Sequence, residues 1–497
     1  MSGLTREGTK KHPEKVIQFG EGNFLRAFVD YMIDVANEKG VFDGSVVIVK
    51  PIEYGNLKMF HDQDCLYTLS HRGKMNGEVI EDYRVITSVS RAIDCYNEYD
   101  AFIECAKNPE LRFVVSNTTE AGIVYDETDK FEYTPAHTYP GKLTQLLYAR
   151  FKAFAGDTSK GLFIIPCELI EGNGHELEKC VYKQADNWNL GEDFKKWLTD
   201  ACSFASTLVD RIVTGYPRDN APEIWEKIGY QDNLPDTCEP FALWVIETKK
   251  SADGSFPLAK EFPLDKAGLP VIFTDNEKPY HERKLRILNG AHTSMVLGAF
   301  LAGKDIVREC MDDPEIKAFM DKCLFDEIIP TLTLPKDELM SFAASVTERF
   351  QNPFIKHALL AISLNSVSKW RARVLPSVTA YVKNEGKLPK CLTFSFAALI
   401  CFYQGQEIRD GALIGIRDGQ EYKIIDDAAV MEFCKENTAA YKSGAIDTKT
   451  YVTKVARKEN FWGMDLTTIP GFVDAVAADI QQVEKIGMKA AISEIIK

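Results

Sequence analysis

The stretch Val16-Ile-Gln-Phe-Gly-Glu-Gly-Asn-Phe-Leu-Arg26 joins a short apolar run to a glycine turn and then to a helical pattern. Apolar residues recur at helical spacing from Phe24 to Val35, and Gly40 ends the pattern. A second apolar run, residues 45–50, follows directly. Strand, glycine turn, helix and strand in this order predict a βαβ unit. Its glycines would let the backbone approach a pyrophosphate at the helix N-terminus.

This unit departs from the usual dinucleotide fingerprint at two positions. Leu25 stands where a third glycine is expected, and the second strand ends in Lys50, with Glu53 as the nearest carboxylate, instead of an acid that would bind ribose. Lys50 has two interpretations: a cation for a 2′-phosphate, as in NADP, or a solvated end of the strand, which we favour. The pattern therefore predicts a nucleotide cofactor without choosing between NAD and NADP.

Two further apolar runs predict more strands of the same sheet. Residues 112–116 lead into Asn117-Thr-Thr-Glu-Ala-Gly122, and residues 161–166 lead into Cys167-Glu-Leu-Ile-Glu-Gly-Asn-Gly174. In open parallel sheets, ligands bind beyond the carboxyl ends of the strands, where these two polar turns would lie. Residues 248–256 are polar and predict a hairpin or loop, not a linker between domains.

After a turn at residues 275–279, long helical periods replace the short strands. We therefore predict an α/β protein with a Rossmann-like dinucleotide-binding domain over residues 1–278 and a mostly α-helical domain over residues 279–497. The predicted helices of the second domain span residues 281–302, 304–323, 338–350, 353–366, 389–403 and 474–495.

Composition excludes several classes of function. A net charge of −14 argues against nucleic acid, which is bound mainly by neutralising phosphates, and against anionic lipid surfaces. The longest apolar run, around residues 392–403, is too short to cross a bilayer. Twelve scattered cysteines without a C-x-x-C pair predict reduced thiols and no zinc framework. We expect a cytoplasmic protein that acts on a small molecule.

The helix predicted at 281–302 carries three polar residues among many apolar ones. On an α-helix, His292 would lie about 80° and Asn289 about 140° around the axis from Lys284. Each residue has a simpler interpretation when taken singly, Lys284 as a solvated cation and His292 as a satisfied core histidine. An amine, an amide and an imidazole on one largely buried helix together favour a ligand site.

Taken together, the motifs resemble the mannitol dehydrogenase family of long-chain polyol and sugar-acid dehydrogenases, and the resemblance covers nearly the whole chain. Its segments are Gly20-x-Gly22-x-Phe24-x-Arg26-Ala27, Gln63-Asp-Cys-Leu-Tyr-Thr68, Val209-Asp-Arg-Ile212, Trp244-Val-Ile-Glu247, Lys284-x4-Asn289-Gly-x-His292 and Arg349-Phe-x-Asn-Pro353. The turns at 116–122 and 167–174 are most similar to members that act on sugar acids of hexuronate breakdown, with NAD and without a metal. The alternatives are a related sugar-acid or polyol dehydrogenase and, more distantly, a nucleotide-binding regulator without catalysis.

The resemblance implies roles for individual residues. Lys284 would be the general acid/base, which requires a pKa lowered by burial or a neighbouring cation. Asn289 would donate a hydrogen bond to the developing alkoxide, and His292 would hold a substrate hydroxyl. The expected cofactor contacts are Gly20, Gly22, Asn23, Phe24, Arg26, Asn117, Thr118 and Glu120. The expected substrate contacts are Asn173, His357, Lys369 and Arg373.

Three positions depart from the family pattern. Cys167-Glu-Leu169 stands where mannitol dehydrogenases have Cys-Asp-Asn, so their second oxyanion amide is absent and Asn173 is a weaker substitute. His281 replaces a glutamate three residues before the lysine. Ala361 replaces a substrate-contacting arginine, while Arg371 and Arg373 are present nearby. These changes favour a pocket rebuilt for a sugar acid.

Overall fold

The computed structural model describes residues 3–218 and 220–497 as two compact units. Of these residues, the first unit comprises 3–73, 79–218 and 220–277, and the second comprises 74–78 and 278–497. The predicted fold class is confirmed: the first unit contains a Rossmann-like parallel sheet, and the second is mostly helical. The boundary predicted between residues 278 and 279 stays a prediction.

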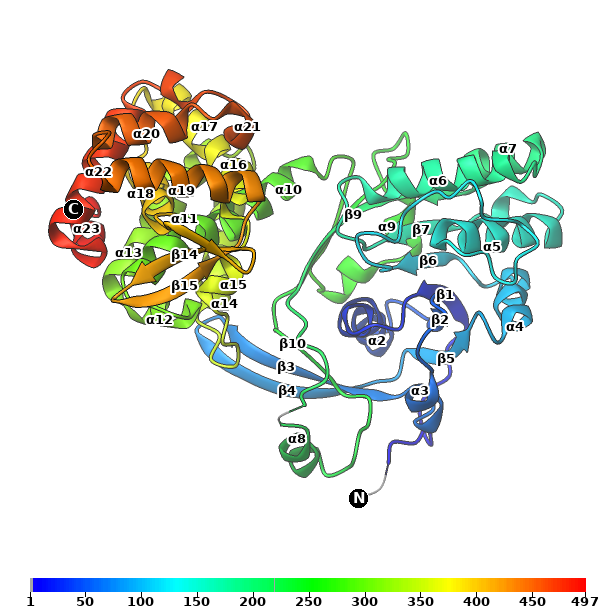
Figure 1. Ribbon diagram of the computed structural model, residues 1–497. Coiled ribbons are helices and arrows are strands. Elements are labelled where there is room, and N and C mark those ends of the chain that lie inside the picture. Colours follow the sequence, from blue (N-terminus) through cyan, green and yellow to red (C-terminus); the bar gives the residue numbers. More distant parts are fainter. Residues whose placement is uncertain (1–2, 219) are drawn as a thin grey trace. The chain divides into compact units, whose positions relative to one another are not determined.

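The sheet of the first unit has six parallel strands in the order β5-β2-β1-β6-β7-β8 (Figure 1). The chain builds outward from β1 to β2 and β5 on one side, and to β6, β7 and β8 on the other. The switch point of the topology therefore lies between β1 and β6, where ligands of such sheets bind. The strands are β1 (Glu14–Phe19), β2 (Ser45–Lys50), β5 (Val89–Asp94), β6 (Phe113–Ser116), β7 (Phe163–Pro166) and β8 (Ser203–Phe204).

Both faces of this sheet are buried, as near-continuous apolar strands require. Val16, Val46 and Ile48 face a core that includes Phe28 and Trp244. The alternate residues of the same strands face a second core to which the helices α4, α5, α6 and α7 contribute (Figure 1). The helices of the first unit are α1 (Asn23–Leu25), α2 (Tyr31–Glu38), α3 (Lys58–Asp62), α4 (Tyr99–Glu104), α5 (Tyr139–Ala153), α6 (Asn173–Asn187), α7 (Glu192–Ala201), α8 (Ala221–Ile228) and α9 (Pro257–Glu261).

Two small sheets in the same half of the sequence were not predicted. The sheet β12-β11-β9 pairs β11 parallel to β12 and antiparallel to β9, and the sheet β10-β3-β4 pairs β10 parallel to β3. Residues 248–256 form turns and coil without a strand, which agrees with the predicted loop. The strands are β3 (Tyr67–Met75), β4 (Glu78–Ile86), β9 (Ser206–Asp210), β10 (Asp236–Cys238), β11 (Leu243–Glu247) and β12 (Val271–Thr274).

The second unit packs its helices around α11 and α18 and carries a three-stranded antiparallel sheet (Figure 1). Its helices are α10 (Lys278–Arg283), α11 (Gly290–Leu301), α12 (Val307–Asp312), α13 (Pro314–Asp321), α14 (Lys336–Phe350), α15 (Leu359–Ile362), α16 (Ser366–Arg373), α17 (Leu375–Glu385), α18 (Lys390–Phe402), α19 (Ala428–Lys442), α20 (Thr448–Ala456), α21 (Glu459–Trp462), α22 (Phe472–Ile486) and α23 (Met488–Ile495). The strands are β13 (Glu407–Arg409), β14 (Ala412–Arg417) and β15 (Gln420–Ile424). Among residues 3–218 and 220–497, none of the helices combines the length and apolar character that a bilayer crossing needs.

Three predicted helices were wrong in extent. The helix at 304–323 breaks at Asp313, which caps α13 while Pro314 occupies its first turn. The helix at 474–495 breaks at Gly487, whose φ of +84° suits glycine. Residues 353–366 contain only the four-residue α15, because His357 and Leu359 pair their backbones with residues 305–307.

A buried carboxyl group makes the stability of the first unit depend on pH. Asp30 is fully buried and accepts hydrogen bonds from Tyr67 (3.3 Å) and Gln18 (3.4 Å). Burial raises the pKa of Asp30 to about 7. A raised pKa means that the folded state binds more protons than the unfolded state, so this residue's contribution to stability falls as pH rises from about 4 to about 7.

We predict that Asp30→Asn stabilises the protein at pH 8, by on the order of 2 kcal/mol, because the amide keeps an acceptor for Tyr67 and removes the buried charge. Urea unfolding at pH 5 and pH 8 measures this, with the exposed Asp82→Asn as the control. A lower urea midpoint for Asp30→Asn than for the wild type at pH 8 would contradict the prediction.

Candidate active site

The helix that carries Lys284 is α-helical at both ends and π-helical in the middle. It runs through α10, a π-helical segment over Lys284–Asn289, and α11. A π-helix pairs each residue with the fifth one along, and single π turns are frequent at functional sites. The α-helical angles expected here are therefore wrong between residues 284 and 289. Lys284 is the first and Asn289 the last residue of this π-helical segment. Their side chains therefore lie on the same side of the helix instead of about 140° apart.

His292 belongs to the same face because it lies three residues beyond Asn289, at the start of α11. Lys284, Asn289 and His292 are each half-buried. The other side of the turn is anchored in the protein: Ile287 is fully buried, and Arg286 Nε donates to Ser377 Oγ at 2.9 Å. The segment therefore holds an amine, an amide and an imidazole together on its less buried side.

The ring of His292 lies between two other rings. It stacks on Phe350, with centroids 3.9 Å apart and planes at 15°, and meets His357 edge-on at 5.5 Å. Its Nε2 atom is shielded from solvent and has no hydrogen-bond partner in the described part of the chain. Burial lowers the pKa of His292 well below its usual value, and positive charge on Arg349, among other neighbours, lowers it further. His292 is therefore a neutral imidazole with a shielded nitrogen that a ligand can engage.

Basic groups from α16 surround this imidazole. Lys369 Nζ donates to the Ile362 carbonyl at 2.8 Å, and Arg373 Nη1 lies 3.4 Å from Thr293 Oγ1, next to His292 in the chain. Burial lowers the pKa of Arg373 and of Lys369, and the charge of Arg373 lowers that of Lys369 further. Burial and Lys369 also lower the pKa of His357. The structure thus brings together His292 with the predicted substrate residues His357, Lys369 and Arg373.

The first unit has a glycine turn at the switch point of its sheet. Gly20 follows β1 with a φ of +124°, and a Cβ there would lie 3.1 Å from the carbonyl oxygen of Asn117, which follows β6. Gly22 caps the helix that begins at Asn23, and a Cβ there would meet no atom within 4 Å. No side chain caps this helix start, so its first N–H groups remain available. The turn therefore fits a pyrophosphate.

The neighbouring turn is held by an acid that the prediction did not assign to the site. Glu168, buried after β7, accepts hydrogen bonds from Ser116 Oγ (3.1 Å), Thr118 N (3.0 Å) and Thr118 Oγ1 (2.9 Å). Burial raises the pKa of Glu168. Leu169 beside it is 63% exposed. Glu168 of the Cys-Glu-Leu sequence thus holds the turn after β6, and the sequence supplies no amide there. An acid directly after a strand was the signal in the sequence that could have revealed this role.

Asn23, Phe24 and Asn117, three other predicted cofactor residues, lie at the same glycine turn. Asn23 is exposed and packs against Gly215, while Phe24 stacks on Phe28 with ring centroids 4.9 Å apart. Asn117 Nδ2 donates to the Cys167 carbonyl at 3.1 Å. The side chain of Glu120 is exposed.

Two predicted contacts have other roles in the structure. Arg26 is buried, donates to the Leu234 carbonyl at 2.9 Å, and lies 3.8 Å from Asp236. Asn173 is fully buried, and its carboxamide bonds the backbone of Pro166, Glu168 and Thr207. These contacts hold both side chains inside the protein, and the roles of Arg26 at the cofactor and of Asn173 at the substrate stay predictions.

Lys50 is not a solvated strand end, which corrects our interpretation of it. It is 0% exposed, and its ammonium group donates to the carbonyls of Ile52 (2.6 Å), Glu53 (3.3 Å) and Tyr54 (3.2 Å). Asp94 at the end of β5 lies 3.2 Å from the Lys50 nitrogen. The charge of Lys50 is therefore already neutralised by a neighbouring strand.

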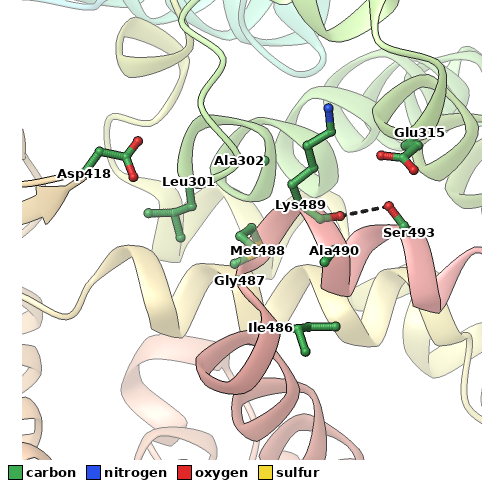
Figure 2. Close-up of a pocket in the computed structure, with 10 residues that line it drawn as sticks. All are labelled: Leu301, Ala302, Glu315, Asp418, Ile486, Gly487, Met488, Lys489, Ala490 and Ser493. Atoms are coloured by element: carbon green, nitrogen blue, oxygen red, sulfur yellow. Dashed lines mark hydrogen bonds between the residues drawn. The ribbon is translucent and has the colours of Figure 1, made fainter.

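A groove of 540 Å³ at the start of α23 holds none of the predicted site residues (Figure 2). Lys489 lines it and pairs with Asp313 at 3.1 Å, while Ser493 donates to the Lys489 carbonyl at 3.1 Å (Figure 2). Its one ammonium group is already paired, so we do not assign the site to this groove.

One buried group of potential metal ligands lies in the second unit. The ligand atoms of Cys323, Glu327 and Cys391 lie within 4.8 Å of one another. Glu327 accepts the N–H groups of Cys391 (2.9 Å) and Leu392 (2.7 Å), and so caps α18. This capping accounts for the buried carboxylate. The expectation of a reaction without a metal stays a prediction.

Comparison with known proteins places the chain in a family. Residues 14–260 match the mannitol dehydrogenase Rossmann domain, and residues 276–484 match the mannitol dehydrogenase C-terminal domain. The chain therefore belongs to the mannitol dehydrogenase family. It is 49% identical to an altronate oxidoreductase of Escherichia coli O1:K1 over 483 residues, 97% of both chains.

Two solved structures have the same fold as this chain. D-sorbitol dehydrogenase in substrate-free form matches 98% of this chain and 96% of its own, with a TM-score of 0.78 and 22% identity. The ternary complex of Pseudomonas fluorescens mannitol 2-dehydrogenase with NAD and D-mannitol matches 98% and 95%, with a TM-score of 0.63 and 23% identity.

We expect substitution by alanine to lower stability at one glycine of the turn and to leave it nearly unchanged at the other. Gly20→Ala should cost about 1–3 kcal/mol of stability, because alanine is strained at a φ of +124° and its Cβ would crowd the Asn117 carbonyl. Gly22→Ala should leave stability within about 0.5 kcal/mol, because its Cβ enters open space. Thermal unfolding of both variants tests this, and equal losses would contradict it.

Proposed function

We propose that this chain is an NAD-dependent oxidoreductase that interconverts D-altronate and D-tagaturonate. The observation that carries the proposal is the 49% identity to altronate oxidoreductases over 97% of both chains. The helix face with Lys284, Asn289 and His292 supports it, because these groups suit proton transfer at a carbinol. We also propose a cytoplasmic location, because all twelve cysteines are free thiols.

Each of the three polar residues on the helix face has its own role in the reaction. The bound NAD supplies a hydride acceptor. Lys284 takes the hydroxyl proton during oxidation and returns it during reduction. Asn289 donates a hydrogen bond to the substrate oxygen as negative charge develops on it. His292, held neutral by burial, binds a substrate hydroxyl.

The first unit favours NAD over NADP. Gly20 and Gly22 leave room for the pyrophosphate at the helix that begins at Asn23. Lys50, the cation that could have bound a 2′-phosphate, is buried and paired with Asp94. Asn117, which donates to the Cys167 carbonyl, and Thr118, which donates to Glu168, are further proposed cofactor contacts. The remaining ones are Asn23, Phe24 and Glu120.

A substrate panel tests the assignment. We expect D-altronate to be oxidised with NAD at a kcat/KM at least about 100-fold above that of D-mannitol, since a site built for a charged group rejects an analogue that lacks the carboxylate. D-mannonate carries the same carboxylate, so a lower kcat/KM for D-mannonate would report recognition of the hydroxyl configuration. Preference for mannonate would identify a fructuronate reductase, and preference for mannitol a polyol dehydrogenase. Binding of NADH without turnover of tagaturonate would instead identify a non-catalytic regulator.

Replacing the proposed acid/base should impair the chemical step alone. We predict that Lys284→Ala lowers kcat by at least about 100-fold, the low end for general acid/base groups, and leaves NAD affinity nearly unchanged. Steady-state kinetics and NADH fluorescence titration measure the two quantities. Lys336→Ala, an exposed lysine at the start of α14, is the control. A loss confined to NAD affinity would remove the role from Lys284.

A further inference from the structure

Lys369 and Arg373 form a pair of half-buried cations on one side of α16. They are four residues apart, so their side chains lie on the same helix face. Within residues 3–218 and 220–497, neither forms an ion pair: Lys369 reaches the Ile362 carbonyl at 2.8 Å, and Arg373 reaches Thr293 Oγ1 at 3.4 Å. Asp426 is close enough to raise the pKa of Lys369. Its carboxylate already accepts hydrogen bonds from the Tyr403 hydroxyl and from the backbone N–H groups of Val367 and Asp427.

Removing two positive charges from water without a counter-charge is unfavourable. The pKa of each group shows this cost, since burial lowers both and Arg373 lowers that of Lys369 further. A ligand that brings one negative charge would offset it. The guanidinium group of Arg373 offers a planar fork of N–H donors, which matches the two oxygens of a carboxylate.

The end of α16 packs directly against the start of α11. A Cβ on Gly290 would lie 3.2 Å from the Arg373 carbonyl oxygen, so glycine permits this close approach. Arg373 also contacts Thr293, the residue after His292. The cation therefore lies beside the helix turn that carries Asn289 and His292. A small sugar acid carries its carboxylate and its carbinol on one short carbon chain, so one molecule can engage both groups.

We propose that Arg373, assisted by Lys369, binds the substrate carboxylate and thereby makes the enzyme prefer a sugar acid over a neutral polyol. This inference rests on the proposed function, because it assumes that the substrate reacts at the face of Lys284, Asn289 and His292. Arg373 determines specificity here and is not a proton donor or acceptor in the reaction.

The same helix provides a matched control. Arg371 carries the same charge two residues earlier, is exposed, and lies over Gly463, where a Cβ would be 3.2 Å from Arg371 Nε. It points away from the face of Lys369 and Arg373, because residues two apart on a helix do not face each other. Loss of Arg371 therefore changes the net charge equally without touching the proposed carboxylate site.

The test compares Arg373→Met and Arg371→Met, since methionine keeps an apolar stem without the charge. For Arg373→Met we expect the KM for D-altronate to rise about 10- to 100-fold, the range for loss of a hydrogen bond to a charged group, with kcat changed less than about 5-fold. The kcat/KM for D-mannitol should not fall. Arg371→Met should change each constant less than about 2-fold.

A binding measurement makes the test independent of turnover. The complex with NADH and D-altronate cannot react, so its thermal stabilisation reports binding alone. We expect altronate to raise the melting temperature of NADH-loaded wild type and Arg371→Met, but not of Arg373→Met. If Arg373→Met does not fold, Arg373→Lys, which keeps the charge and loses the fork, should raise the KM for altronate at least about 5-fold.

The outcomes separate this inference from the proposed function. Wild-type protein that does not oxidise altronate contradicts both. Wild-type activity on altronate with a KM unchanged in Arg373→Met, or in Arg373→Lys where that variant is needed, contradicts the role of Arg373 alone. Equal losses on altronate and mannitol also overturn it, because they would show a structural role and not recognition of the carboxylate.

Discussion

The π-helical turn from Lys284 to Asn289 is the constraint on which the candidate site depends. In an α-helix these residues would point in different directions, and a substrate oxygen could not meet both. The wider turn places them on one side, and the return to α-helix at Gly290 adds His292 to the same face. Burial of Ile287 on the opposite side fixes the turn in the fold. The local hydrogen-bonding pattern, more than the choice of residues, is what assembles the three groups.

Three positions carry residues other than those that the family pattern predicts. At the sheet, Leu169 stands where the family pattern has an amide, and Glu168 beside it accepts hydrogen bonds from Thr118. Lys50 replaces a ribose-binding acid, and Asp94 from the adjacent strand cancels its charge. In the second unit, Arg373 presents a cation beside α11 where the sequence lacks the family's arginine at position 361.

Sequence reasoning predicted the parallel sheet well, because its strands are apolar runs followed by polar turns, and β2 begins and ends where expected. It missed the π turn, since a pattern built on 3.6 residues per turn does not represent a pairing five residues apart. It placed Lys50 in solvent because the partner Asp94 is far away in sequence. It did not foresee that Asn173 accepts a hydrogen bond from the Thr207 backbone, because Thr207 lies on another strand. Local sequence patterns predict helices, strands and motifs. Which polar side chains remain available to bind a ligand depends on partners that are distant in the sequence.

The most direct test of the account is chemical rescue of Lys284→Ala by small amines. If the Lys284 amine exchanges a proton with the substrate oxygen, methylamine should restore activity at least about 10-fold, and more basic amines should be more effective at equal concentrations of free amine. Asn289→Ala, which removes the neighbouring amide on the same face, should show no rescue. A folded, NAD-binding Lys284→Ala protein whose rate is the same with and without amines would contradict the claim that this helix face performs the proton transfer.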